Sequence, residues 1–242
     1  MTQLSIQEIE KLRKRITAIL DQTVQDKKAV ISIYSIDDPS RDARITGFSK
    51  LIDVFRATEL ALIFITKHLM DKKWWHDVCL NQIETNGLNA YINGYVRFIK
   101  FGLVHGVFSC IESSIRLYLR YLDPTACRGG LDNFENIYKC LLQSKLSKPR
   151  PDGVKLLHLL RLIRNTIHNN GVHFNKNGKE YNITRNGTMY EFKQGFLVRG
   201  ITWDFILTIL DEGRALLKTI VEDDKMKAIT GEISDPAGPY GS

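Results

Sequence analysis

Apolar residues recur at three- and four-residue spacing along most of the chain, which is the pattern of helices with one buried face. This pattern predicts helices over residues 4–28, 48–70, 88–122, 132–146, 154–169 and 203–227. Two of these helices begin with typical capping residues, because Ser5 stands three residues before Glu8 in a capping box and Thr202 suits an N-cap. The sequence therefore predicts a mainly α-helical bundle.

The helix predicted over residues 88–122 is the longest, and its apolar positions extend around more than one side. Such a pattern is typical of a central helix that is buried between neighbours. Glu112 and Arg116 are one turn apart and are expected to form an ion pair on the helix surface. Three glycines in this helix would allow a neighbouring helix to approach closely: Gly94, Gly102 and Gly106.

Residues 180–193 replace the helical pattern with alternating apolar and polar positions around Asn186-Gly187. This dipeptide is the preferred pair for a two-residue type I′ turn, so the segment predicts an inserted β-hairpin. The resulting register places four apolar side chains on one face, with Tyr181 opposite Phe192 and Ile183 opposite Tyr190. We expect this face to pack on the helices, and residues 196–198 are a candidate third strand.

The chain of 242 residues contains neither internal repeats nor a low-complexity linker, so we expect a single domain over residues 1–242. Residues 233–242, which contain glycine and proline, are expected to be a flexible tail. The net charge of +7 favours anionic partners such as RNA. The sequence lacks a C-x-x-C pair and an uninterrupted apolar span, and its first residues lack the apolar stretch expected of a signal peptide. We therefore expect a cytoplasmic protein with no membrane segment, no metal and no other cofactor.

The helix predicted over residues 154–169 carries the side chains with the clearest chemical potential. At about 100° per residue, its apolar side chains occupy one arc of the helix surface: Leu156, Leu159, Leu160, Ile163 and Ile167. Arg161, Arg164 and His168 share a separate arc of about 60°, with Asn165 at its edge. Two guanidiniums and an imidazole are therefore expected on the same side of the helix, which should end at Gly171.

This combination of side chains suits the cleavage of an RNA phosphodiester. An imidazole transfers protons near neutral pH, and a guanidinium binds phosphate and stabilises the charge of the transition state without a metal ion. His168 lies in the last helical turn, where the helix dipole favours the protonated form, so we expect a general acid or a phosphate-binding group. The alternative is a structural role, in which Arg161 and Arg164 pair with carboxylates such as Glu112.

The stretch Arg164-Asn165-Thr166-Ile167-His168 resembles the signature of the HEPN family, the higher-eukaryote and prokaryote nucleotide-binding domains. Members of this family are helical bundles, and many are metal-independent endoribonucleases of toxin–antitoxin, phage-defence and RNA-processing systems. The signature is an Arg followed by a polar residue, with a His after four to six intervening positions near the end of a late helix. The resemblance covers this motif and the helical architecture, with the hairpin as an insertion.

On this resemblance, Arg164, Asn165 and His168 are the expected catalytic residues, and Arg161 and His173 are expected to bind RNA. The spacing leaves open which arginine acts. Arg164 has the polar follower, but only three residues separate it from His168, whereas Arg161 has the longer spacing and is followed by a leucine. The resemblance also implies a homodimer and a protein partner such as an antitoxin.

A second interpretation is a non-catalytic helical module that uses the same cationic face to bind RNA or a protein and to dimerise. The chain contains no H-E-x-x-H, P-loop or G-x-G-x-x-G sequence that would indicate another enzyme class. His105 lies in the long apolar helix and is expected to be a hydrogen-bonded core residue. The adjacent Trp74 and Trp75 are expected to pack against the core and to cover a helix end, with base stacking as the alternative.

Overall fold

The computed structural model describes residues 4–34, 36, 38–79, 85–126, 133–185 and 187–237. Its helices are α1 (Ile6–Tyr34), α2 (Ala43–Phe64), α3 (Lys72–Cys79), α4 (Thr85–Leu122), α5 (Phe134–Cys140), α6 (Pro151–His168), α7 (Trp203–Val221) and α8 (Asp224–Lys227). Two π-helical turns extend α2 and α5, namely η1 (Ile65–Leu69) and η2 (Leu141–Lys145). The hairpin consists of β1 (Tyr181–Arg185) and β2 (Thr188–Phe192). The predicted class, mainly α with one inserted β-hairpin, is confirmed.

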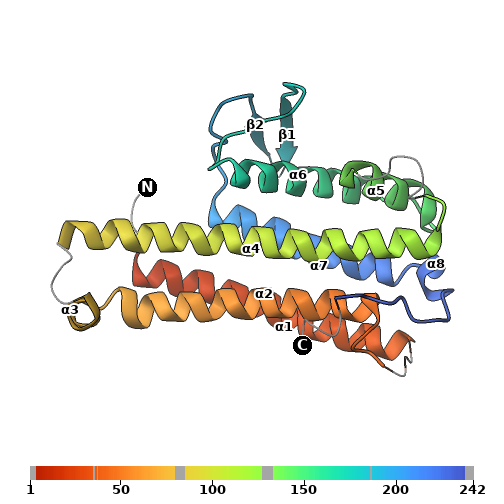
Figure 1. Cartoon of the computed structure of the whole chain (residues 1–242), viewed down its shortest axis with the longest axis horizontal. Helices are drawn as coiled ribbons and strands as arrows, with labels where there is room; N and C mark the ends of the chain where they lie inside the picture. The colour runs from red at the N-terminus through yellow and green to blue at the C-terminus, as the bar shows by residue number, and fades with distance from the viewer. Residues whose placement is uncertain are drawn as a thin grey trace.

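Helix α4 runs along the middle of the molecule and contacts most of the other long helices (Figure 1). The pair α1 and α2 lies on one side of α4, whereas α5 and α6 lie on the other. Helix α7 contacts α1, α4 and α6. The hairpin stands on the outer side of α6, away from α4. This arrangement buries α4 on more than one side, in agreement with its apolar pattern.

Local hydrogen bonds define several helix ends. The backbone N–H of Ser5 donates to Glu8 Oε2 over 2.7 Å, and the N–H of Glu8 donates to Ser5 Oγ over 3.2 Å, so the predicted capping box is confirmed. Thr202 Oγ1 accepts from the N–H of Phe205 over 3.2 Å as the N-cap of α7. Helix α2 begins earlier than predicted because the side chain of Asp42 accepts a backbone N–H of its first turn.

Other helix boundaries also differ from the prediction, and α1 continues to Tyr34 instead of ending at residue 28. Helix α6 begins at Pro151, since proline is favoured in the first helical turn, where its missing N–H costs no hydrogen bond. The last predicted helix ends at Val221, and α8 starts after Asp223. The carboxylate of Asp223 caps α8 and also accepts from the backbone N–H and the hydroxyl of Ser147, over 2.9 and 2.6 Å. Asp223 therefore connects the chain before α6 to the chain after α7.

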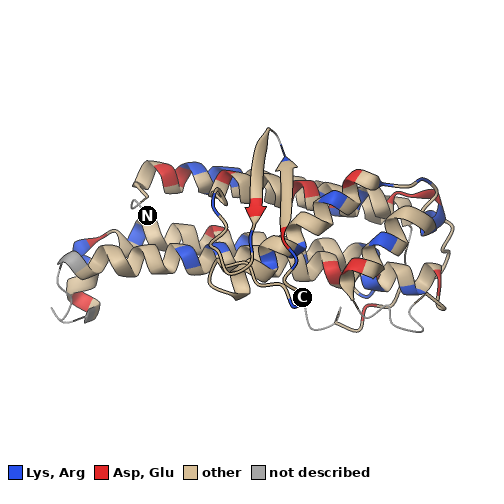
Figure 2. Ribbon diagram, turned by 90° about the horizontal axis from the view of Figure 1, so that it is seen from above, with Lys and Arg blue, Asp and Glu red and all other residues tan. Residues whose placement is uncertain are grey.

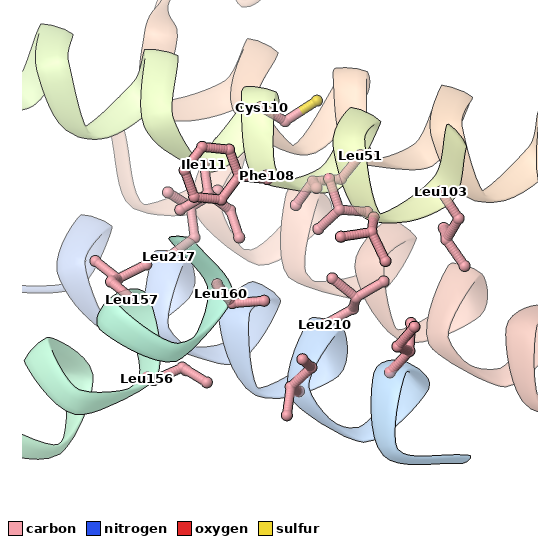
Figure 3. Close-up of a cluster of buried hydrophobic side chains, with 14 of the residues drawn as sticks. Leu51, Leu103, Phe108, Cys110, Ile111, Leu156, Leu157, Leu160, Leu210 and Leu217 are labelled. Carbon is pink, nitrogen blue, oxygen red and sulfur yellow. The ribbon is translucent and has the colours of Figure 1, made fainter. Parts of the chain in front are cut away.

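In one part of the core, apolar side chains from α2, α4, α6 and α7 meet around α4 (Figure 3). A glycine allows close packing at one helix contact, because a Cβ at Gly106 would lie 2.9 Å from both methyl carbons of Val54 in α2. Gly94 and Gly102 differ, since a Cβ at either position would meet nothing within 4 Å. The predicted role of glycine in close helix packing is confirmed at Gly106 and is wrong at the other two positions.

The expected flexible tail is wrong for its first part. Ile233 and Asp235 are buried, because the segment packs at the start of α2. There the backbone N–H of Ile233 donates to Asp42 Oδ2 over 3.1 Å. The buried Arg44 pairs with the same carboxylate over 2.6 Å and donates to two carbonyl oxygens of the chain just before Ile233. Residues 238–242 lie outside the described residues.

The hairpin strands pair in the predicted register, with Tyr181 opposite Phe192 and Ile183 opposite Tyr190. Tyr190 and Phe192 are buried, so the predicted inner face packs against the helices. Gly187 has a φ of 75°, the left-handed conformation that a type I′ turn requires, and its turn partner Asn186 lies outside the described residues. The candidate strand at residues 196–198 does not form, since Leu197 makes only an isolated bridge with Val172.

The two adjacent tryptophans pack at the end of the α2–η1 helix. The indole N–H of Trp75 donates to the Leu69 carbonyl over 2.7 Å. The ring of Trp74 meets Phe64 edge-on, with centroids 5.7 Å apart. Both indole rings are half-buried. The predicted packing of this pair over a helix end is confirmed.

The segment Gly87–Leu122 of α4 is long and apolar enough to cross a membrane by length and composition. Half of its most apolar window is buried within the protein. A central helix of a helical bundle has the same length and composition, because it is apolar on several sides. The cytoplasmic location therefore stays a prediction.

Alanine substitutions at Gly102 and Gly106 of α4 should have opposite effects on the stability of the fold. Gly102→Ala should raise the free energy of unfolding by about 0.5–1 kcal/mol, because alanine has the higher helix propensity and the added methyl group meets nothing. Gly106→Ala should lower it by about 1–3 kcal/mol, since its methyl group collides with the stiff side chain of Val54. Urea unfolding measures both changes, and a stabilised Gly106→Ala variant would contradict this packing of α2 on α4.

Candidate functional site

Helix α6 ends in a tight turn directly after His168. The N–H of Gly171 donates to the Thr166 carbonyl over 2.9 Å, and the N–H of Asn170 donates to the Ile167 carbonyl over 3.1 Å, which is the Schellman arrangement. Asn170 has a φ of 54° and Gly171 a φ of 93°. The predicted stop is confirmed, with Asn170 rather than Gly171 in the first left-handed position. This turn therefore places His168 at the last position of α6.

His168 in α6 meets His105 in α4. The centroids of the two imidazole rings are 5.2 Å apart and the ring planes are at 86°, so the edge of one ring faces the other. Both residues are exposed. The expectation that His105 lies in the core is wrong, because it shares an exposed stripe of α4 with Gly102 and Ser109. The small or polar character of those positions, at three- and four-residue spacing, is the sequence signal that indicates an exposed stripe.

Arg164 lies one helical turn before His168 and is positioned by a ring and an amide. Its Cζ atom lies 5.5 Å from the centroid of the Phe108 ring in α4, and its Nη1 donates to Asn165 Oδ1 over 3.2 Å. In the part of the chain that the structure describes, Arg164 forms no ion pair, and its buried Nε has no hydrogen-bond partner. The positive charge of Arg164 is therefore not neutralised by a neighbouring carboxylate.

Arg161 is held in a different environment. Its Nη2 forms an ion pair with Glu135 Oε2 of α5 over 2.7 Å and lies 3.3 Å from His158 Nδ1. Its side chain is only 15% exposed. The carboxylate named as an alternative partner, Glu112, pairs instead with Arg116 over 2.6 Å, as predicted. The two arginines of the motif helix thus have different neighbours, and those of Arg161 do not include His105 or His168.

His173 lies beneath the hairpin. It is 1% exposed, and its Nε2 lies 3.1 Å from the Lys179 carbonyl oxygen. Its ring packs against Tyr181 and Phe192, with centroid distances of 5.9 and 5.7 Å. A side chain in this position does not reach solvent, so the expected RNA contact of His173 does not fit the fold. We assign His173 to the packing of the hairpin.

His168 is exposed, but partial desolvation lowers its pKa below the ordinary value, and the charges of Arg164 and then His105 lower it further. A lowered pKa favours the neutral imidazole at pH 7. This direction is opposite to the preference for the protonated form expected from the helix dipole, since desolvation and the neighbouring Arg164 and His105 each lower the pKa. His168 is better suited to accept a proton than to donate one.

Basic residues are not gathered around this site alone. Figure 2 shows Lys and Arg interspersed with Asp and Glu along the helices that face the viewer. Among the described residues, no three His, Cys, Asp or Glu side chains are close enough together to hold a metal ion. The expectation of a protein without metal or other cofactor stays a prediction.

No protein-family model, curated protein or solved structure matches this chain. The candidate site is therefore defined by its geometry and by the motif in α6. His105, Arg164, Asn165 and His168 are termed the two-histidine site below. They come from two helices whose contact is part of the hydrophobic core.

The two-histidine site combines groups that move protons with a group that binds anions. One neutral imidazole accepts a proton, and a second imidazole, when protonated, donates one. The guanidinium beside them binds a phosphate oxygen and stabilises negative charge. Because both histidines are exposed, a large substrate such as a polynucleotide can reach them.

Each arginine of α6 should control the pKa of a different histidine. Arg164→Gln should raise the pKa of His168, because the charge of Arg164 lowers it in the wild type. Arg161→Gln should instead raise the pKa of His158, which is lowered by burial and then by the charge of Arg161. NMR titration of the imidazole resonances measures both effects. A pKa of His168 that rises in Arg161→Gln and stays constant in Arg164→Gln would contradict these placements.

Proposed function

We propose that the protein is a HEPN-like endoribonuclease that cleaves RNA without a metal ion, with the two-histidine site as its active site. The observation that carries this proposal is the contact of His105 with His168 beside the guanidinium of Arg164. The motif by itself supplies one imidazole. The second imidazole, from α4, adds the proton donor that general acid–base catalysis requires.

The proposed reaction is an attack of the ribose 2′-oxygen on the adjacent phosphorus. Neutral His168 accepts the proton of the 2′-hydroxyl, and Arg164 stabilises the negative charge of the phosphorane. Protonated His105 donates its proton to the 5′-oxygen as the bond between that oxygen and phosphorus breaks. The products are a 2′,3′-cyclic phosphate and a 5′-hydroxyl. The lowered pKa of His168 supports its role as the general base at neutral pH.

Asn165 acts in this proposal as a positioning residue. Its side-chain oxygen accepts from Arg164 Nη1 over 3.2 Å and so restricts the orientation of the guanidinium. Arg161, by contrast, stabilises the contact of α6 with α5 through its ion pair with Glu135. The proposed catalytic residues are therefore His105, Arg164 and His168, and the two residues expected to bind RNA, Arg161 and His173, are assigned to structure.

The resemblance of the motif to the HEPN signature also supports proposals about assembly, biological role and partners. It implies a homodimer in which two copies of the motif surround one RNA. It also implies a toxin or phage-defence role and a protein partner such as an antitoxin, and the location expected from the sequence is the cytoplasm. The net charge of +7 supports an RNA partner.

Exposed aromatic side chains favour a second candidate, a non-catalytic module that binds RNA or a protein. On α4, Tyr91 is 58% exposed and Phe98 is 70% exposed. Phe98 also stacks on Tyr95, with ring centroids 6.4 Å apart and planes at 23°. Exposed rings bind the bases of single-stranded RNA by stacking and bind protein partners by burial. This candidate predicts binding without turnover.

RNA cleavage in the presence of EDTA tests the proposed function. The wild type should cleave a mixed RNA pool and leave 2′,3′-cyclic phosphate ends. His168→Ala and His105→Ala should each lower the rate by about 10²- to 10⁴-fold, the usual contribution of a general acid or base. Arg164→Gln should lower it by about 10²- to 10³-fold through the loss of transition-state stabilisation. Denaturing gels and end-group analysis measure these rates and products.

His76→Ala is the matched control, because His76 is an exposed histidine on α3 outside the site. It should cleave RNA at the wild-type rate, and circular dichroism verifies that each variant is folded. Cleavage that persists in both His105→Ala and His168→Ala would contradict the proposed mechanism. A folded wild type that binds RNA without cleaving it would favour the second candidate.

A further inference from the structure

A cavity of about 580 Å³ opens between the start of α1, the first half of α4, the last turn of α6 and the start of α7. Its volume lies within the range of small-molecule sites, roughly 300–1,000 Å³. Neither histidine of the two-histidine site lines it. The cavity is therefore separate from the two-histidine site, and its ligand need not be RNA.

Most of the cavity wall is apolar. Leu12, Val96 and Ile206 line it from α1, α4 and α7, and all three are buried. Trp203, the first residue of α7, adds a half-buried indole ring. Because three helices contribute to the wall, its shape is fixed by the packing of the bundle. Such a surface suits the apolar body of a ligand.

Lys100 places an amine in this apolar wall. Its Nζ donates to the Ile201 carbonyl and lies 5.9 Å from the centroid of the Trp203 ring. Burial lowers the pKa of Lys100 to about 8. No carboxylate pairs with Lys100 among the residues that the structure describes. A partly buried ammonium without a counter-ion is unfavourable, and a bound anion would stabilise its charged form.

The other charged groups of the cavity also leave a positive balance. Lys11 and Arg97 line it, and within the described ranges neither forms an ion pair. The two acidic lining residues have other partners, since Glu8 belongs to the capping box of α1 and Asp204 pairs with Arg15. The start of α7 adds the positive end of a helix dipole. The electrostatic environment therefore favours one negative group beside the apolar surface.

We propose that this cavity binds a small organic monoanion with an apolar body, such as a medium-chain or aromatic carboxylate. The anionic group accepts a hydrogen bond from Lys100 Nζ and is attracted by Lys11 and Arg97. The apolar body packs against Val96 and Trp203. A neutral ligand would leave the ammonium without a counter-ion, and a nucleic-acid backbone would require an open cationic surface instead of an apolar cavity.

Fluorescence titration of the full chain with 1-anilinonaphthalene-8-sulfonate tests this proposal. N-phenyl-1-naphthylamine is the matched probe, since it has the same aromatic body without the sulfonate. The wild type should bind the sulfonate at a single saturable site. Lys100→Met should weaken sulfonate binding by about tenfold or more, the effect of losing one charge-assisted contact. The same substitution should change the affinity for the uncharged probe by less than about twofold.

Two further variants complete the test. Arg97→Met changes an exposed side chain, so the fold should be unaffected, and it should weaken sulfonate binding by about two- to threefold. Lys14→Met removes an exposed lysine of α1 that does not line the cavity and should bind like the wild type. Absence of saturable binding by the wild type would overturn the proposal, as would equal sulfonate affinity of the wild type and Lys100→Met. If Lys100→Met does not fold, an unchanged affinity of Arg97→Met overturns it.

Discussion

The close contact of α4, α6 and α7 at Gly213 is the constraint on which the rest of the structure depends. A Cβ at Gly213 of α7 would lie 2.8 Å from the side chain of Ile111 in α4 and 3.4 Å from that of Leu160 in α6. The missing side chain lets the three helices meet at this point, which places α6 beside α4. His105 and His168 extend from these two helices. The contact of their rings, with centroids 5.2 Å apart, therefore follows from the same packing. This part of the hydrophobic core and the candidate chemistry therefore share one helix interface.

The hairpin and α5 determine which polar side chains of the motif helix reach solvent. Glu135 of α5 engages Arg161, and Tyr181 of the hairpin covers His158 with ring centroids 5.1 Å apart. The last turns of α6 carry Arg164 and His168 beyond these two contacts, and the first turn carries the exposed Asp152 and Lys155. Arg161 forms an ion pair with Glu135, whereas Arg164, one helical turn later, has no carboxylate partner among the described residues. The two arginines of the motif thus lie in different environments because their tertiary neighbours differ.

Features that depend on a few neighbouring residues could be predicted from the sequence. The capping box of α1, the register of the hairpin and the stop after α6 each follow from local hydrogen bonds and backbone geometry. The contact of His105 with His168 could not be predicted, because periodicity within one helix does not report which other helix packs beside it. For the same reason, the sequence does not predict the ion pair of Arg161 with Glu135 in α5. It also does not predict the burial of Ile233, which packs next to α2.

The proposed function requires that α4 and α6 present one RNA-binding surface that includes His105 and His168. The most direct test is an NMR titration of the full chain with 2′-O-methyl RNA, which lacks the attacking hydroxyl and so binds without being cleaved. The account predicts that the ring resonances of His105 and His168 shift together and that the pKa of His168 rises, because a phosphate stabilises its protonated form. The buried His173 should not respond. Resonances of His105 and His168 that stay unchanged at saturating RNA would contradict the account.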